Sequence, residues 1–114
     1  MKINKDTNIE KVNDNIFRIG SIVVWAYHYS ARIVTFGRVT RMTGSTIWVN
    51  KIEKHRVSGD FMQGEVMPNL EDPGTPMKKS FRIKKRADGT EFFKESNYCF
   101  GQLWDGKPED EWSD

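Results

Sequence analysis

The side chains of this 114-residue chain that could do chemistry are mostly basic and aromatic. Between positions 78 and 86 the chain carries six lysines and arginines and no acidic residue, which is a third of its 18 basic residues. Further cations flank Trp48 in the sequence. Single-stranded nucleic acid is held by cations along its backbone and by aromatic rings that stack on its bases. These residue types therefore favour non-covalent binding over catalysis.

We predict two strips of ligand-binding side chains on the outer face of a β-sheet. Their members are Arg38, Arg41, Trp48, Lys51, Arg82, Lys84 and Arg86. A structural interpretation competes with this one. Trp48 would cover a secondary core beneath residues 57–77, and the arginines would lay their stems on apolar surface around it. On that interpretation the basic stretch is a solvated sheet surface with no partner.

Catalytic and metal-binding side chains are few. Cys99 is the only cysteine, and His28 and His55 are the only histidines. A nucleophile needs a base within hydrogen-bond reach, and zinc sites need clustered cysteine and histidine ligands. Cys99 lies in an apolar stretch, which is typical of a buried, inert thiol. We therefore predict that the protein is not an enzyme and has no metal or cofactor.

Composition indicates one domain in a reducing compartment. A chain of this length buries about two thirds of its unfolded surface, and a single cysteine excludes an internal disulfide framework. No apolar stretch resembles a signal peptide or reaches the roughly 18 residues of a membrane span. We expect a cytoplasmic protein without membrane contact. The net charge of +2 does not by itself require a polyanionic partner, and the oligomeric state stays open.

Short strands must position the candidate side chains. Residues 22–27 form an apolar run rich in β-branched and aromatic residues, which is typical of a buried strand. Further strands are expected over residues 33–42, 79–86 and 98–104. We predict a mainly β fold, a single small SH3-like antiparallel β-barrel over residues 16–108.

The two ends of the chain are predicted to lie outside this barrel. Thr7 and Glu10 fit a capping box, so residues 1–15 form an arm or at most one short N-terminal helix. Residues 109–114 form an acidic C-terminal tail. This tail either pairs with the basic stretch at residues 78–86 or only adds solubility.

Glycines are expected to direct strand facing in the first hairpin. In a regular strand Val34 and Phe36 would point to one face of the sheet and Val39 to the opposite face, because side chains alternate. A bulge at Gly37 would turn all three inward. A three-residue loop with Gly44 in the left-handed conformation then sets the register. The predicted cross-strand pairs are Arg41–Ser45, Val39–Ile47, Gly37–Val49 and, on the outer face, Arg38–Trp48.

The second hairpin is predicted to turn at residues 87–89, with Gly89 as its bulge residue. The predicted pairs are Arg86–Thr90, Lys84–Phe92 and Ile83–Phe93. Phe81 then shares the inner side with Ile83, because side chains alternate along a strand. The outward side chains are Arg82, Lys84 and Arg86.

Glycines and prolines break up residues 57–77. A structureless loop of this length is uncommon in a compact domain. We expect one short strand near residues 65–67 and a flexible tip at residues 71–76.

Several short motifs between Ile16 and Pro108 resemble a group of small uncharacterised proteins encoded by bacteriophages and mobile elements. The motifs are Gly20-x-Ile22-Val23-Val24-Trp25 followed by Tyr27 or Tyr29, Phe36-x-x-Val39 with Gly44, Asp88-Gly89, and Trp104-Asp105-Gly106-Lys107-Pro108. The chain departs from the pattern of the group at Ser21, where an acidic residue is usual, and at His28. The resemblance implies a phage-like origin and brings no catalytic activity with it.

Two functions fit these expectations. The leading hypothesis is a non-enzymatic, phage-like accessory protein that binds nucleic acid through its basic and aromatic face. The alternative is an inhibitor or adaptor that acts on a host defence protein by protein contact, because Trp and Arg are typical of interface hot spots. Salt dependence separates the two, since phosphate binding weakens linearly in log K against log salt.

Overall fold

The computed structural model describes residues 16–60 and 62–113. The arm or helix predicted over residues 1–15 therefore lies outside the described residues. Within these bounds the chain is mainly β, as predicted, and no helix could cross a membrane. Its strands are β1 (Ile22–His28), β2 (Arg32–Met42), β3 (Thr46–Ile52), β4 (Lys54–Gly59), β5 (Gln63–Pro68), β6 (Thr75–Pro76), β7 (Phe81–Arg82), β8 (Lys84–Lys85), β9 (Glu91–Ser96), β10 (Cys99–Leu103) and β11 (Glu109–Trp112).

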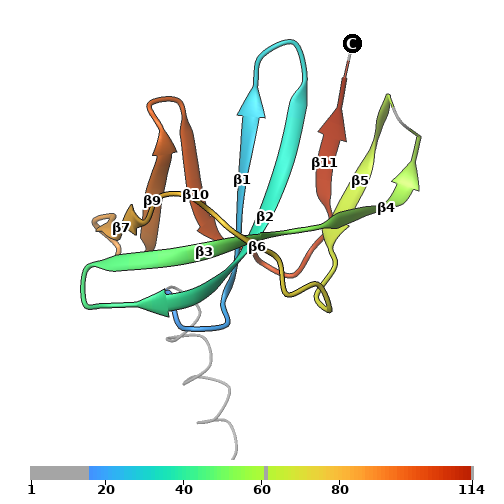
Figure 1. Cartoon of the computed structure of the whole chain (residues 1–114). Helices are drawn as coiled ribbons and strands as arrows, with labels where there is room; N and C mark the ends of the chain where they lie inside the picture. The colour runs from blue at the N-terminus through green and yellow to red at the C-terminus, as the bar shows by residue number, and fades with distance from the viewer. Residues whose placement is uncertain (1–15, 61, 114) are drawn as a thin grey trace, which may run out of the picture.

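The strands form one antiparallel sheet that is not closed (Figure 1). Hydrogen bonding orders eight of them as β4-β5-β11-β2-β1-β10-β9-β8, while β3 pairs with β2 and also with the short strands β6 and β7. The mainly β class is confirmed, and a closed SH3-like barrel is not shown. In Figure 1 the β1–β2 hairpin stands between β9–β10 on one side and β11 with β5 on the other.

The β1–β2 hairpin is buried on both of its faces. In β1, Val23 belongs to one hydrophobic core and its neighbour Val24 to another. In β2, Val39 faces the first core and Phe36 faces the second. Successive side chains point to opposite faces of a strand, so a strand covered on both sides reads as an unbroken apolar run. This explains the apolar character of residues 22–27.

The two cores differ in composition. Core 1 contains Phe17, Val23, Trp25, Val39, Ile47, Val49, Phe81, Phe93 and Cys99. Core 2 contains Val24, Val34, Phe36, Ile52 and Val66. The buried Phe93 ring lies 5.9 Å from Trp25 and 4.7 Å from Phe81, and in core 2 Trp104 packs edge-on against Phe36 at 5.9 Å. Burying one such side chain contributes about 1.5–3 kcal/mol.

Gly37 does not host a bulge, so that prediction is wrong. It lies in regular ladders with β1 and β3. A Cβ at this position would lie 2.4 Å from Val49 Cγ1, so glycine is needed for the close approach of this side chain. Val34, Phe36 and Val39 are all buried as predicted, but they reach two cores on opposite faces.

The register of β2 against β3 also differs from the prediction. The observed pairs are Arg38–Asn50, Val39–Val49, Arg41–Trp48 and Met42–Ile47. An irregularity between Val39 and Arg41 shifts the pairing and keeps apolar residues opposite one another. Gly44 does not have a positive φ, so the predicted left-handed loop residue is wrong.

The turn of the second hairpin is confirmed. Gly89 has a φ of 89°, and the Arg86 N–H donates to the Thr90 carbonyl at 2.9 Å. Lys84 lies opposite Phe92, as predicted. The sequence therefore predicts the turn end of this hairpin correctly.

The strand that precedes this turn changes partner at Ile83. The Ile83 N–H donates to the Ser45 carbonyl at 2.8 Å, and Phe81 pairs with Ile47 of β3. The predicted Ile83–Phe93 pair is therefore wrong, because the strand leaves β9 at this point. Phe81 and Ile83 still pack in core 1 with Phe93, as the predicted facing requires.

The segment after β5 lies against the sheet. The strand predicted near residues 65–67 is confirmed as β5. The predicted flexible tip is instead held by hydrogen bonds, since Arg38 donates to the Leu70 and Asp72 carbonyls. The Asp72 carboxylate accepts from the Glu53 and Gly74 N–H groups, and β6 then pairs with β3.

The acidic end of the chain is a strand rather than a tail. Residues 109–112 form β11, which pairs along β5 and meets β2 at Trp112 and Arg32. Its ion pairs go to Arg32, Lys54 and Arg56, and none goes to the described cations of residues 78–86. The acidic stretch is therefore part of the sheet and is paired with cations of β2 and β4.

Glu111 fixes β11 to its neighbours. This buried carboxylate accepts from the Val34 N–H at 3.0 Å, and it pairs with Lys54 and, at 3.5 Å, with Arg56. Burial acts to raise the pKa of Glu111. The Lys54 hydrogen bond, the Val34 N–H and the two positive charges outweigh burial, so the pKa is lower than that of an ordinary glutamate.

Replacing Glu111 with glutamine should lower the free energy of unfolding by about 1–3 kcal/mol at neutral pH, because charged hydrogen bonds are lost. Since folding depresses the pKa of Glu111, its contribution is complete above the unfolded value. It is lost as the pH falls below the ordinary value of 4.5. Urea unfolding, at neutral pH and at about pH 4, should show a weaker pH dependence for Glu111→Gln than for the wild type. Asp110→Asn, exposed on the same strand, is the control; equal pH dependence of all three proteins contradicts the role of Glu111.

Gly101 lies opposite Phe93, and a Cβ there would come within 2.0 Å of the Phe93 ring. We expect Gly101→Ala to destabilise the protein by about 1–3 kcal/mol, because overpacking displaces a buried ring. Gly44→Ala is the matched control, since its Cβ would meet nothing within 4 Å. Urea midpoints measure both variants. Equal midpoints would show that Phe93 does not pack closely on β10.

Candidate functional site

The predicted ligand-binding residues lie in separate places. Two of them are Arg38 and Lys51, on the part of the sheet that holds the 70–76 segment. A second group on the outer face of β2, β3 and β7 consists of Arg41, Trp48 and Arg82. A third group beside β9 consists of Lys84 and Arg86.

Arg38 has a structural role. It is half-buried, and its two Nη atoms donate to the Leu70 carbonyl at 2.5 Å and the Asp72 carbonyl at 2.9 Å. Its guanidinium therefore holds the 70–76 segment. The sequence predicts that this side chain faces solvent, and the structure differs in this respect. Lys51 is exposed at the β3–β6 ladder, opposite Thr75.

Arg41 and Trp48 form a stacked pair on the outer face. The Arg41 guanidinium carbon lies 4.3 Å from the centroid of the half-buried Trp48 ring. Such a contact contributes about 0.5–1 kcal/mol at an exposed site. Arg82 pairs with Thr46, two residues from Trp48, so all three predicted residues share one face.

A surface that combines more cations with aromatic rings lies on β8, β9 and β10. Phe93 and Gly101 face core 1, so the residues beside them in each strand point outward. We name this surface the cation–aromatic face; its members are Lys84, Arg86, Phe92, Lys94, Phe100 and Gln102. The Phe92 and Phe100 rings lie 6.0 Å apart, and the Arg86 guanidinium lies 4.5 Å from the Phe92 centroid. Phe100 is half-exposed.

The acidic residues of β9 point away from this surface. Glu91 is buried and accepts from the Phe17 N–H at 2.7 Å. Glu95 accepts from the Tyr27 hydroxyl at 2.6 Å, and this bond, with burial and the nearby charge, raises the pKa of Tyr27 to about 12. Within residues 16–60 and 62–113, ion pairs with carboxylates involve only Arg32, Lys54, Arg56 and Lys85. Within the same described residues, the cations of the cation–aromatic face have no carboxylate partner and can bind an anion.

The sequence predicts part of this surface. Lys84 and Arg86 point outward as expected. Lys94 and Phe100 were missed. Lys94 could have been placed on this face because it is two residues from Phe92 in the same strand. Phe100 could not, because the register of β10 shifts between Cys99 and Phe100.

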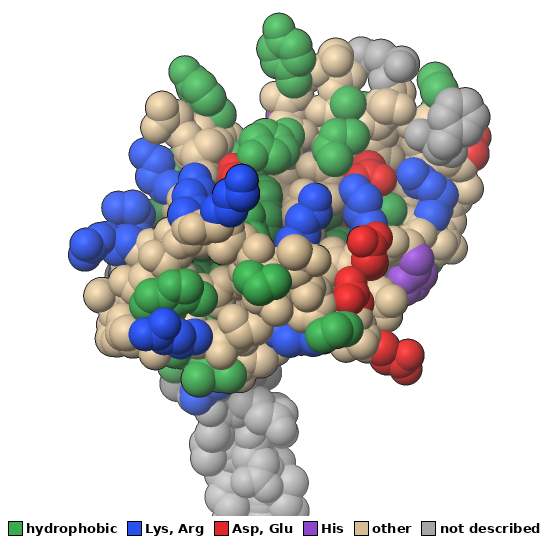
Figure 2. All heavy atoms as spheres, in the orientation of Figure 1, with side chains coloured by type: hydrophobic (Ala, Val, Ile, Leu, Met, Phe, Trp, Pro, Cys, Tyr) green, Lys and Arg blue, Asp and Glu red, His purple; other side chains and the backbone are tan. Residues whose placement is uncertain are grey.

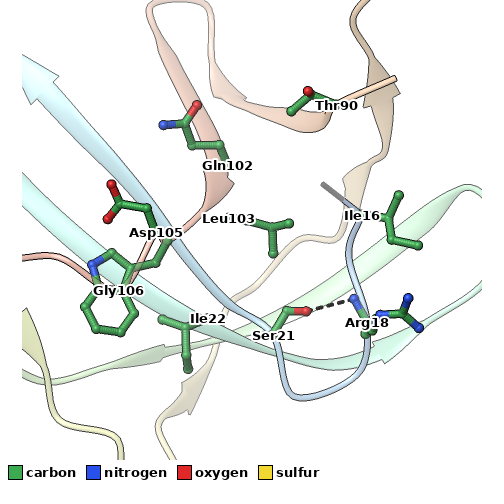
Figure 3. A pocket seen from close by; sticks show the side chains of 10 residues that line it. Ile16, Arg18, Ser21, Ile22, Thr90, Gln102, Leu103, Asp105 and Gly106 are labelled. Carbon is green, nitrogen blue, oxygen red and sulfur yellow. Dashed lines mark hydrogen bonds between the residues drawn. The ribbon is translucent and has the colours of Figure 1, made fainter. Parts of the chain in front are cut away.

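Two hollows border the cation–aromatic face. The larger, of about 690 Å³, lies between the segment before β1 and the turn after β10. Figure 3 shows Ile16 and Arg18 on one side of it and Asp105 on the other. The smaller, of about 250 Å³, lies beside Phe100. Gln102 lines both hollows, so they lie along the same strand.

The smaller hollow combines apolar walls with fixed polar groups. Its apolar wall includes Val24, Ala26 and Phe100. Arg32 is held in place, because its Nε donates to His28 Nε2 at 3.1 Å and a second nitrogen donates to the Asp110 carbonyl. Its third nitrogen donates to Glu109 Oε1 at 3.3 Å. Among the described residues, Glu109 Oε2 and the exposed Gln102 side-chain amide have no protein hydrogen-bond partner, so both are accessible to solvent or to a ligand.

The hairpin ends carry exposed aromatic side chains. Tyr29 at the β1–β2 turn is fully exposed, and Tyr98 at the β9–β10 turn is 93% exposed. Trp112 is partly exposed, with its ring 6.0 Å from that of His28. Figure 2 shows hydrophobic side chains projecting at this end of the molecule. Exposed aromatics of this kind are typical of protein-binding surfaces.

Cys99 lies in core 1, as predicted. It is 1% exposed, and its Sγ donates to the Ala26 carbonyl at 3.3 Å. Burial, together with the charge of Glu95, raises the pKa of Cys99. A high pKa lowers the thiolate fraction, so the thiol is a poor nucleophile.

No protein-family model, curated protein or solved structure matches this chain. The resemblance to phage proteins therefore stays a prediction.

A thiol reagent tests the environment of Cys99. We expect Ellman's reagent to label native protein at about pH 8 at least ~100-fold more slowly than protein unfolded in guanidinium chloride, because labelling requires opening of core 1. Absorbance of the released thiolate measures the rate. Equal rates in the two states contradict the buried position.

Proposed function

We propose that this protein binds nucleic acid, without catalysis, through its cation–aromatic face. The observation that carries the proposal is the pair of rings, Phe92 and Phe100, 6.0 Å apart on neighbouring strands. Lys84, Arg86 and Lys94 surround them without carboxylate partners in the described chain. Bases stack on such rings with about 1–3 kcal/mol each, and the cations bind phosphate.

A purely solvated sheet face explains this surface less well. A solvated face needs charges, but it gains nothing from a half-exposed ring such as Phe100 beside a second one. Aromatic side chains on adjacent strands are the means by which RNA-binding sheets stack bases. Arg41 and Arg82, near Trp48, add a second positive region to the same molecule.

We propose further that core 1 is the interior of a small SH3-like barrel. The support is that β7 pairs with β3 while β8 pairs with β9, so one short segment joins the strands on two sides of core 1. Small barrels of this type often carry nucleic-acid surfaces. The phage-like motifs support an accessory role in the cytoplasm of a host cell.

The second candidate function is an inhibitor or adaptor that acts on a host protein by contact. The observation that favours it is the exposure of Tyr29 and Tyr98 at the hairpin ends. Residues 109–112 belong to the sheet, so the aromatic side chains rather than an acidic tail would carry this function.

A salt titration tests the nucleic-acid proposal. Fluorescence anisotropy of labelled DNA and RNA should show log K falling linearly with log salt. Lys84→Ala and Lys94→Ala, at two exposed cations of the cation–aromatic face, should each reduce the slope by about one, because each removes a phosphate contact. Lys51→Ala removes an exposed cation from another part of the sheet and serves as the matched control. Absence of binding to any DNA or RNA at low salt would exclude this function and favour the second candidate.

A further inference from the structure

We infer that the ligand of the cation–aromatic face is a single strand, one base of which, a guanine, enters the smaller hollow beside Phe100. This inference rests on the proposed function and adds to it the strandedness and the base. The observations behind it are the half-exposed Phe100 ring beside Phe92, the alignment of the two hollows and the polar atoms of the smaller hollow that have no protein partner among the described residues.

The half-exposed Phe100 ring favours an unstacked base. Phe100 presents a half-exposed ring on the surface of the sheet, where a base face can lie against it, whereas Phe92 beside it is partly buried and lies under the Arg86 guanidinium. In a duplex the base faces are covered by their neighbours, so only edges and phosphates are accessible. Stacking on aromatic side chains is therefore a property of single-stranded binding.

The two hollows define the path of the strand. Both are lined by Gln102, which pairs with Phe92 on one side and with Val24 on the other. A ligand that follows β10 therefore passes from the larger hollow, over the aromatic rings, to the smaller one. Lys84, Arg86 and Lys94 flank this path on the side of β9 and bind its phosphates.

The smaller hollow has the size of a fragment rather than of a larger ligand. Its volume of about 250 Å³ is below the range of roughly 300–1,000 Å³ typical of drug-sized sites. Val24, Ala26 and Phe100 supply apolar walls for a flat ring, and Tyr98 stands at the rim. A single nucleobase fits such a space.

The polar groups of the hollow select the base. Glu109 is held by Arg32 through Oε1, which leaves Oε2 as an unpaired acceptor. A carboxylate only accepts hydrogen bonds, so it repels phosphate and favours ligand groups that donate N–H or O–H hydrogen bonds. Guanine offers two adjacent donors, N1–H and the N2 amino group, next to its O6 acceptor. The unpaired Gln102 amide supplies the donor for O6.

The test uses the full chain and labelled oligonucleotides of about twelve nucleotides. An all-thymidine strand, the same strand with one central guanine, the same strand with inosine in place of guanine, and a mixed duplex are compared by anisotropy. We expect the guanine strand to bind about 5- to 100-fold more tightly than the all-thymidine strand. Inosine lacks the N2 amino group and should lose most of this advantage.

Two variants separate the parts of the inference. Phe100→Leu keeps an apolar side chain and should weaken every single strand about 5- to 100-fold, while duplex binding changes little. Glu109→Gln should bring the guanine-to-thymidine ratio close to one, and Asp110→Asn, its exposed neighbour on β11, should keep the wild-type ratio. Urea midpoints show whether each variant is folded.

The outcomes are distinguishable from those of the proposed function. Tight single-strand binding without a guanine preference, or equal binding of duplex and single strands, overturns this inference and leaves nucleic-acid binding in place. No binding of any oligonucleotide removes both. A guanine preference that survives in Glu109→Gln also overturns the assigned hollow.

Discussion

Burial of the β1–β2 hairpin on both faces is the constraint on which the rest of the structure depends. Neighbours such as Val23 and Val24 are both buried, although they point in opposite directions. Each face must therefore be covered by other elements, because exposed apolar surface is unfavourable in water. β3, β7, β9 and β10 contribute side chains to core 1 on one side, and Ile52 of β3, Val66 of β5 and Trp104 cover core 2 on the other.

The position of the candidate site follows from which part of the sheet is left uncovered on the face of core 2. β11 is fixed by Glu111 to β2 and β4, so it lies beside β2, on the opposite side of the hairpin from β9 and β10 (Figure 1). Gln102 of β10 pairs with Val24 and lies on the same face of the sheet as core 2. Unlike Val24, Gln102 is exposed, so this face of β10 is open to solvent. The cation–aromatic face and both hollows lie along this boundary. An uncovered part of the sheet thereby becomes the surface with the most binding chemistry.

Residue types near turns were the most predictable part of the site. Gly89 sets a tight turn, and alternation from that turn correctly directs Lys84 and Arg86 outward. Arg38 shows the opposite case, since nothing in its neighbourhood indicates that carbonyls of residues 70 and 72 will accept from it. Phe100 was missed because its partners come from another strand of irregular register. Distance in the sequence, rather than residue type, limited these predictions.

The sequence alone determined the mainly β class, the buried residues of the two hairpins and the outward cations after residue 80, because alternation and turn glycines act locally. Only the tertiary structure decided that there are two cores. A run of apolar residues at consecutive positions is consistent with a bulged strand that covers one core. It is equally consistent with a regular strand that lies between two cores. The choice depends on whether distant residues, here Val66 of β5 and Trp104, cover the second face. Glu111 of β11 can be buried because cations from another element, Lys54 and Arg56 of β4, compensate its charge.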